Sequence, residues 1–213
     1  MESIWSAGVE MPHFKSIEGD IQTEVLIIGG GMAGILCAYF LQKNRVPYVL
    51  VEGKTICSGI TKDTTAKITA QHGLIYHRLL KIAGYEKAKM YLDANQSAVQ
   101  QFVKLCHGIN CDLERKMAYV YSINDRKKLE KEADALCRLG VDTDISEKTK
   151  LPFYHVGAVG LAGQAQFHPL KFVAAIAKDL NIFEHSFVTE LKEHEAVTVN
   201  GKITFQKVIF ATH

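Results

Sequence analysis

Three glycines near the N-terminus have a spacing that suits phosphate binding. Gly29, Gly31 and Gly34 follow the pattern G-x-G-x-x-G, and Glu52 stands 23 residues after the first of them. In this pattern the first glycine permits a tight turn, the second lets the backbone approach a pyrophosphate, and the third lets a helix pack closely on a strand. The N–H groups and partial positive charge of a helix N-terminus then attract the phosphates. The spacing therefore predicts a dinucleotide site.

The residues around these glycines are typical of a strand, a turn, a helix and a second strand. Residues 25–28 form a short, continuously apolar run, as in a strand buried on both faces of a parallel sheet. Residues 33–43 place apolar side chains at helical spacing, and residues 48–51 form the next apolar run. We therefore predict a βαβ unit over residues 24–52.

The same region contains an uncharged stretch of seventeen residues, Val25–Leu41. A transmembrane helix needs about 20 apolar residues, and each glycine within the stretch would weaken a helix by roughly 1 kcal/mol. The acidic residues before the stretch also differ from the positively charged start of a signal peptide. We expect no membrane segment here.

The acidic side chain of Glu52 narrows the choice of nucleotide. A carboxylate accepts hydrogen bonds from a ribose diol and repels a 2′-phosphate, which favours NAD or FAD over NADP. The glycine motif does not choose between these two, because both contain ADP. Residues 58–67 form a small, hydroxyl-rich loop that could line a second phosphate or a ribityl chain, which favours FAD. A solvated turn explains this loop equally well.

The composition of the 213-residue chain is that of a globular protein, with 47% hydrophobic residues and a net charge of +2. Basic residues do not alternate with aromatic ones, so we expect no nucleic-acid partner. The five cysteines form no C-x-x-C pair, which predicts a reducing compartment, the cytoplasm, and scattered core thiols. We expect no metal site.

Beyond the βαβ unit, apolar periodicity predicts alternating helices and strands. Gly84 should interrupt the helix expected at 74–104, and Asn200–Gly201 should form a hairpin turn. The charged residues of the helix expected at 125–139 are interpreted as a solvated face. The expected helices cover residues 74–104, 125–139 and 169–180, and the expected strands cover 117–121, 156–167, 188–191, 196–199, 203–205 and 208–211.

Several segments together resemble a known family. They are Ser3-Ile4-Trp5, Pro12, Phe14, Gly19-Asp20, VLIIGGGMAGILCAYFL, TTAKITAQHGLIY at 64–76, YLDANQSAV, FHP at 167–169, VTEL at 188–191 and VIFATH at the end. Across nearly its whole length the chain resembles the FAD-dependent oxidoreductases of the D-amino-acid oxidase and glycine oxidase superfamily. It is most similar to the subgroup that often carries a C-terminal Rieske domain.

This resemblance implies an α/β fold, in which a Rossmann-like FAD-binding domain is interleaved with α+β segments of a substrate domain. It also implies an enzyme that oxidises a small amine or amino acid by hydride transfer to the flavin of FAD. Cofactor contacts are expected at Gly29, Gly31, Met32, Ala33, Gly34, Glu52, Gly53, Lys54, Thr64, Thr65, Ala66, Val188, Ala211 and Thr212.

The resemblance places Gln71 and His72 beside the isoalloxazine ring of the flavin. His72 would accept a proton or polarise the flavin, since its reference pKa permits either form. A histidine that only packs or hydrogen-bonds locally is an equal alternative. No residue is assigned a catalytic role from the sequence.

The chain also departs from the family pattern. It ends at His213, near the middle of such an oxidoreductase, and it lacks the C-x-H and C-x-x-H pairs of a Rieske site. We therefore expect residues 1–213 to be one FAD-binding oxidoreductase domain that is incomplete at its C-terminus, with a dimer or a missing C-terminal half as its partner. His213 also replaces the glycine of the usual A-T-G. Two alternatives stay open: an NAD-dependent dehydrogenase, and a non-catalytic FAD-binding fragment that needs a partner chain.

Overall fold

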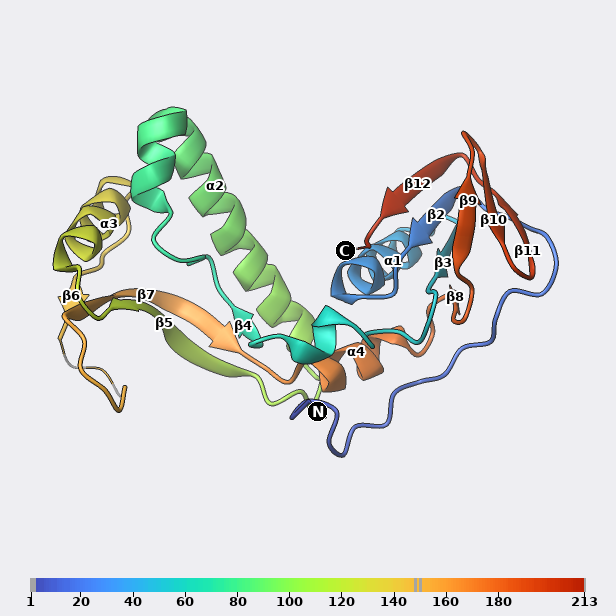
Figure 1. Ribbon diagram of the computed structural model, residues 1–213, viewed down its shortest axis with the longest axis horizontal. Coiled ribbons are helices and arrows are strands. Elements are labelled where there is room, and N and C mark those ends of the chain that lie inside the picture. Colours follow the sequence, from blue (N-terminus) through green and yellow to red (C-terminus); the bar gives the residue numbers. More distant parts are fainter. Residues whose placement is uncertain (1–2, 148, 150, 213) are drawn as a thin grey trace. The chain divides into compact units, whose positions relative to one another are not determined.

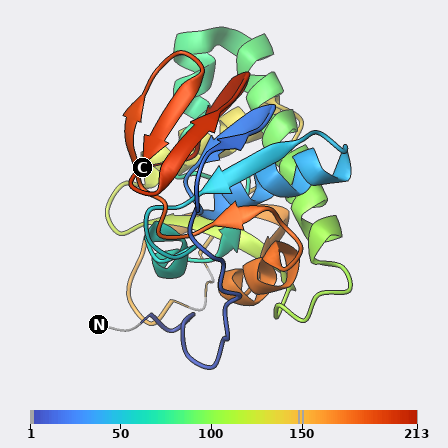
Figure 2. The same ribbon diagram turned by 90° about the vertical axis from the view of Figure 1, so that its right-hand side faces the viewer.

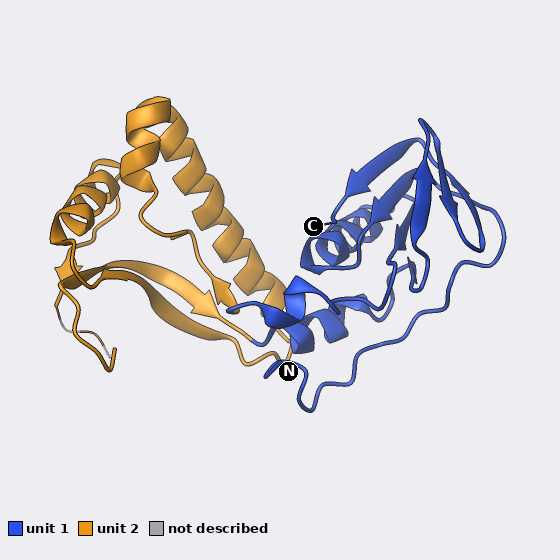
Figure 3. Ribbon diagram, viewed as in Figure 1, with its two compact units in different colours: residues 1–65, 168–213 blue, residues 66–167 orange. Residues whose placement is uncertain are grey.

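The computed structural model describes residues 3–147, 149 and 151–212. These residues form two compact units, which Figure 3 distinguishes by colour. Unit 1 combines the segment up to Thr65 with the segment from His168 onward, and unit 2 is Ala66–Phe167. The expectation for His213 lies outside the described residues.

A parallel four-stranded sheet forms the centre of unit 1. Its strand order is β12 (Lys207–Phe210), β2 (Val25–Ile28), β3 (Tyr48–Val51) and β8 (Ile182–Phe183). The register pairs each residue of β2 with residues of both β12 and β3. The continuous apolar runs of β2 and β3 are explained by this central position, because both faces of the strands are covered.

One face of the parallel sheet is covered by α1 (Met32–Lys43), and the other by a smaller sheet (Figures 1 and 2). The smaller sheet has the order β1 (Ile21–Gln22), β11 (Gly201–Thr204), β10 (Glu195–Thr198) and β9 (Val188–Leu191). Leu26, Val49 and Val51 pack against Ala196 and Ile203 between the two sheets. This core fixes the ends of β2 and β3, where the glycine motif begins. The 3₁₀ helix η1 (Ile60–Asp63) and α4 (Pro169–Ala177) complete unit 1.

Unit 2 is an antiparallel sheet with helices on one face. Its strands are β4 (Lys67–Ile68), β7 (Gly157–Gln166) and β5 (Glu114–Ser122), with β6 (Ile145–Ser146) also paired to β7. The helices α2 (Tyr76–Cys106) and α3 (Arg126–Arg138) pack on the sheet through Leu92, Leu129 and Val159. The predicted interruption of the first helix is confirmed, because Gly84 has a φ of 79° and a ψ of 174° within α2.

One interpretation of the α3 charges is wrong. Glu132 is fully buried rather than part of a solvated face. Its two carboxylate oxygens accept hydrogen bonds from the backbone N–H groups of Tyr76 (2.8 Å) and His77 (2.9 Å). These donors belong to the first turn of α2, where N–H groups lack intrahelical partners. Glu132 therefore caps α2 from a neighbouring helix.

No helix in the described part of the chain is both long enough and apolar enough to cross a membrane.

Candidate functional site

A cavity of about 470 Å³ lies in unit 1 at the carboxyl ends of the parallel strands. Ligands of open α/β sheets bind at this edge. The glycine turn after β2, the first turn of α1, the residues after β3 and the residues after β12 all contribute to the walls. The lining residues are Gly29, Gly31, Met32, Ala33, Glu52, Lys54, Cys57, Ser58, Gly59, Ile60, Thr61, Ala211 and Thr212.

Two of the three motif glycines are required by backbone packing. Gly29 has a φ of 115°, and a Cβ at this position would lie 2.6 Å from the carbonyl oxygen of Ala211. A Cβ on Gly34 would lie 1.9 Å from the carbonyl oxygen of Gly29. Gly34 therefore allows α1 to approach the turn after β2, as the motif predicts.

Gly31 differs from the other two glycines because its environment within the protein is open. A Cβ there would meet only Thr61 Oγ1, at the ordinary contact distance of 3.4 Å. The backbone of Gly31 is extended, with φ −78° and ψ −177°, which any residue adopts. Neither strain nor packing requires a glycine, so the space above Gly31 is available to a ligand in the cavity.

Glu52 joins the loops that follow β2 and β3. Its Oε2 accepts a hydrogen bond from the N–H of Gly30 (2.8 Å), and its Oε1 accepts one from the N–H of Lys54 (2.8 Å). Each carboxylate oxygen has a second lone pair. The side chain can therefore hold the two loops together and still accept a hydrogen bond from a hydroxyl group in the cavity.

The segment 57–61 forms a wall of the cavity that the sequence indicated only in part. The N–H of Met32 in the first turn of α1 donates to Thr61 Oγ1 (3.1 Å), and the N–H of Cys57 donates to the carbonyl of Gly30 (2.9 Å). Ser58 and Thr61 belong to the hydroxyl-rich loop singled out in the sequence. Cys57, by contrast, gave no signal beyond that of a core thiol.

Cys57 is buried and has a φ of 55°, which is unusual for a residue other than glycine. The pKa of its thiol is raised from 9.0 to about 12, chiefly by burial and to a smaller extent by the carboxylate of Glu52, while a hydrogen bond from Thr61 lowers it. The cavity therefore presents a neutral thiol. It is neither a thiolate nucleophile nor an anion that would repel phosphate.

Eight of the predicted cofactor contacts line this cavity: Gly29, Gly31, Met32, Ala33, Glu52, Lys54, Ala211 and Thr212. Six other predicted contacts do not line it. Gly34 and Gly53 support the cavity walls by close packing, and the carbonyl of Thr64 accepts a hydrogen bond from the Trp5 indole (2.8 Å). Of the remaining three, Thr65 is exposed, Ala66 is buried with a φ of 56°, and Val188 begins β9.

The two residues predicted to face the flavin belong to unit 2. Gln71 is buried, and its amide nitrogen donates to the carbonyl of Val159 (3.2 Å). His72 is exposed, with its Nε2 3.3 Å from Asn95 Oδ1. Within the described residues, no group of His, Cys, Asp or Glu side chains has the arrangement of a metal site.

The chemistry of the unit 1 cavity fits the ADP half of FAD. A glycine turn with open space at Gly31 and a helix N-terminus suits a pyrophosphate. A carboxylate held by two backbone N–H groups suits a ribose diol. A volume of about 470 Å³ is within the usual range for a small-molecule site.

Comparison with known proteins supports the same assignment. Residues 24–213 match the model of the family described as "FAD dependent oxidoreductase" (DAO). A protein of Bacillus subtilis described as a Rieske 2Fe-2S iron-sulfur protein, YhfW, is 32% identical over 210 residues, which cover 94% of this chain and 41% of that protein.

Solved structures share the fold. Glycine oxidase from Geobacillus kaustophilus superposes with a TM-score of 0.71 at 18% identity, covering 90% of this chain and 55% of that one. L-proline dehydrogenase from P. horikoshii superposes with a TM-score of 0.69 at 18% identity, covering 91% of this chain and 54% of that one. L-amino acid deaminase from Proteus vulgaris superposes with a TM-score of 0.66 at 18% identity, covering 95% of this chain and 50% of that one. The chain thus spans about two fifths of the Bacillus protein and about half of each enzyme structure. By the family match over residues 24–213, the chain belongs to the FAD-dependent oxidoreductases of the DAO family.

Proposed function

We propose that this chain binds FAD and takes part in oxidising a small amine or amino acid, with hydride transfer from the carbon next to nitrogen. The observation that carries the proposal is the unit 1 cavity. There, the open face of Gly31, the first turn of α1 and the Glu52 carboxylate meet at the carboxyl ends of β2 and β3. Family membership favours FAD over NAD as the dinucleotide.

The residues have distinct roles in this proposal. Gly31, Met32 and Ala33 contact the pyrophosphate, with the N–H of Ala33 as the donor because that of Met32 is bonded to Thr61 Oγ1. Gly29 and Gly34 shape the turn that presents them. Glu52 binds the adenosine ribose, beside Gly53 and Lys54.

The remaining predicted contacts follow the cofactor away from the pyrophosphate. Val188 offers backbone groups to the adenine, and Ala211 and Thr212 pass beneath the cofactor. Thr64, Thr65 and Ala66 lie along the flavin side, and Gln71 and His72 adjoin the isoalloxazine ring.

When bound, the flavin supplies the hydride acceptor. The protein's part is to hold an amine with its C–H bond toward that acceptor and to exclude water until the transfer is complete. The resulting imine hydrolyses in water. An amino-acid substrate is supported by the solved structures with this fold, which include a glycine oxidase, an L-proline dehydrogenase and an L-amino acid deaminase.

The visible absorption spectrum tests the proposal. The purified chain is mixed with FAD, freed of unbound cofactor, and scanned. Retained flavin absorbance at one equivalent per chain is expected, and absence of retained flavin would contradict the proposal. Anaerobic addition of glycine, L-proline and L-leucine should then bleach the flavin band for at least one of them, whereas the matching 2-hydroxy acids should leave it unchanged. We also predict a cytoplasmic location.

A further inference from the structure

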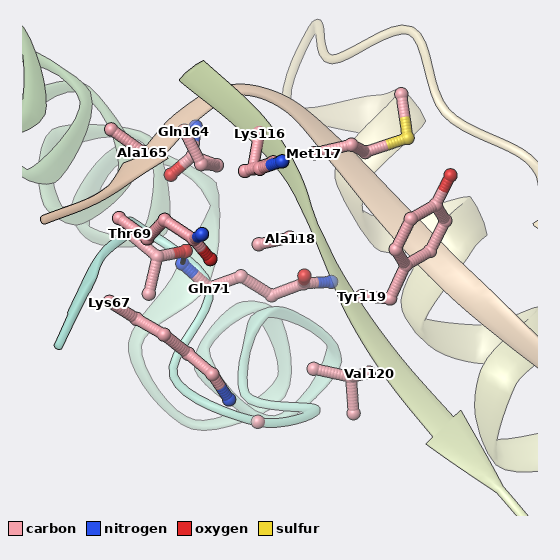
Figure 4. A pocket seen from close by; sticks show the side chains of 12 residues that line it. Lys67, Thr69, Gln71, Lys116, Met117, Ala118, Tyr119, Val120, Gln164 and Ala165 are labelled. Carbon is pink, nitrogen blue, oxygen red and sulfur yellow. Dashed lines mark hydrogen bonds between the residues drawn. The ribbon is translucent and has the colours of Figure 1, made fainter. Parts of the chain in front are cut away.

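The cavities of the two units differ in how their walls are built. A cavity of about 220 Å³ in unit 2 lies between the loop after β4 and the strands β5 and β7 (Figure 4). Paired strands keep their shape through backbone hydrogen bonds. In unit 1, by contrast, one wall of the cavity is residues 57–61, which form no strand and contribute only to the short 3₁₀ helix η1. We call residues 57–61 the wall.

The wall is not a stable element by itself. The helix η1 has four residues and no side-chain cap at its N-terminus, and 3₁₀ helices of this length have poor hydrogen-bond geometry. Cys57 has a φ of 55°, a conformation that costs free energy in residues other than glycine and persists only where the surroundings impose it. The conformation of the wall therefore depends on contacts from outside it.

The N-terminal residues 3–17 supply contacts at the carboxyl end of the wall. They run along unit 1 without forming a helix or strand, and Figure 1 shows them in dark blue. The indole Nε1 of Trp5 donates a hydrogen bond to the carbonyl of Thr64 (2.8 Å), and the hydroxyl of Ser3 donates one to the carbonyl of Lys62. Both acceptors lie within three residues of the wall.

Trp5 is in turn fixed by α4. Its ring meets the ring of His168 edge to face, with the centroids 5.1 Å apart and an angle of 75° between the planes. His168 is buried and is the N-cap of α4, where its Nδ1 accepts a hydrogen bond from the N–H of Lys171 (3.3 Å). The indole therefore connects the end of a packed helix to the end of the wall.

Glu184 holds the other end of the wall. Its Oε1 accepts a hydrogen bond from the N–H of Ile56 (2.7 Å), and its Oε2 accepts one from the N–H of Phe14 (3.1 Å). The side chain is only 1% exposed, and hydrogen bonds to a carboxylate are stronger than those between neutral groups. One carboxylate thus joins the residue that precedes the wall to the N-terminal segment.

A separate cavity of about 200 Å³ lies between the wall and the N-terminal segment. Met11 and His13 line it from the N-terminal segment, while Cys57 and Ser58 line both this cavity and the larger one at the glycine motif. The middle of the wall therefore adjoins open space on both sides. Its position depends on the hydrogen bonds at its two ends more than on close packing.

We propose that residues 3–17 form a strap that holds the wall in the conformation that binds FAD, with Trp5 and Glu184 as positioning residues. The inference rests on the proposed function and gives a role to Ser3 and Trp5, which lie outside the FAD cavity. Because coupling between two sites is reciprocal, bound FAD stabilises the strap to the same extent as the strap stabilises bound FAD.

The first test measures the rate at which FAD dissociates from the loaded chain. Trp5→Phe keeps a ring beside His168 but removes the N–H donor, so FAD should dissociate about fivefold faster, the loss expected for one hydrogen bond. Trp5→Ala also removes the ring and should accelerate dissociation by about tenfold or more. Ile4→Ala changes a neighbouring side chain that is 76% exposed, and it should leave the rate unchanged.

Amide hydrogen exchange then separates positioning from a general loss of stability. In the wild type, FAD should slow exchange in residues 3–17 as well as in the wall, and leave the hairpin of β10 and β11 unchanged. Without FAD, Trp5→Phe should exchange faster than the wild type in the wall and equally in β2 and β3. A purely structural role of Trp5 would give no FAD-dependent protection of residues 3–17.

Equal dissociation rates in wild type, Trp5→Phe and Trp5→Ala would overturn the inference, as would exchange in residues 3–17 that FAD leaves unchanged. If Trp5→Ala lowers the unfolding midpoint, Trp5→Phe and the exchange of the wild type decide the matter. Failure of the proposed function is a different result, namely a wild type that retains no flavin. In that case equal exchange of the wall in wild type and Trp5→Phe, both without FAD, would reject the strap as well.

Discussion

The backbone N–H of Gly30 donates a hydrogen bond to Oε2 of Glu52 at 2.8 Å. This bond links the glycine turn after β2 to the end of β3, and it does so without any ligand. The carboxylate of Glu52 therefore positions the two loops that a nucleotide would contact. It is also the candidate acceptor for hydrogen bonds from the ribose hydroxyls. Replacing it should affect both the stability of the chain and its affinity for FAD.

We expect Glu52→Ala to lower the free energy of unfolding by about 1–3 kcal/mol, because the N–H groups of Gly30 and Lys54 lose a charged acceptor. Urea unfolding without FAD measures this loss. Glu193→Ala, at an exposed site, is the control. An unchanged midpoint for Glu52→Ala would show that water replaces the carboxylate without cost. A separate FAD titration should show weaker binding by a similar amount.

Substitution of three glycines should separate folding from cofactor binding. Gly31→Ala should leave the unfolding midpoint of the chain nearly unchanged, since a Cβ there makes only an ordinary contact, yet lower its affinity for FAD at least tenfold by filling the phosphate space. Gly34→Ala should lower the midpoint strongly, because its Cβ would lie 1.9 Å from the carbonyl oxygen of Gly29.

Gly59→Ala provides the matched control for Gly31. Gly59 lines the same cavity, has a φ of −97°, and has nothing within 4 Å of the added Cβ. It should leave both stability and FAD affinity close to the wild type. Equal FAD affinities for Gly31→Ala and wild type would contradict the assignment of Gly31 to the pyrophosphate.

The local parts of this fold could be predicted from the sequence, and the parts that depend on distant segments could not. The runs that became β2, α1 and β3 carry their own apolar periodicity and glycine spacing. By contrast, β8 has two residues and gains its identity only by pairing with β3. Cys57 lines the cavity because its backbone is bonded to Gly30, a contact that no pattern around the cysteine indicates.

Glu132 illustrates the same limit for charged residues. In sequence it belongs to a helix rich in lysine and glutamate, which predicts exposure. Its burial depends on Tyr76, whose N–H lies 56 positions earlier in the chain. The free energy of desolvating the carboxylate is offset by two hydrogen bonds that exist only once α2 and α3 have packed together.

We expect Glu132→Ala to destabilise the protein by about 1–3 kcal/mol, since the N–H groups of Tyr76 and His77 at the start of α2 would lose their acceptor, and that of Tyr76 is buried. Glu130→Ala, two residues away on an exposed part of α3, should cost less than about 0.5 kcal/mol. Urea unfolding monitored by circular dichroism compares the two variants. Similar midpoints for both would refute the capping role.

Stability should decline at alkaline pH in part because of Cys57. The folded thiol keeps its proton up to about pH 12, whereas an unfolded cysteine loses it near pH 9.0. Between these values the unfolded state binds fewer protons than the folded state. The contribution of Cys57 is therefore fully present below about pH 9 and is lost as the pH rises toward 12.

Urea midpoints at about pH 8 and about pH 10.5 test this linkage. The drop between the two should be smaller for Cys57→Ala than for the wild type. Cys137→Ala, which removes an exposed thiol, should show the wild-type drop. Identical drops in all three proteins would mean that other groups account for the alkaline loss.

The two ends of unit 2 meet. Near its termini, the N–H of Phe167 donates to the carbonyl of Ala66 at 3.3 Å, and Lys67 pairs with Gln166 in the sheet. An insertion closed in this way can be lengthened, shortened or exchanged by recombination, since its entry and exit points stay fixed. Natural selection can therefore change the length or sequence of unit 2 while residues 29–34 and Glu52, which precede it in the chain, stay unchanged.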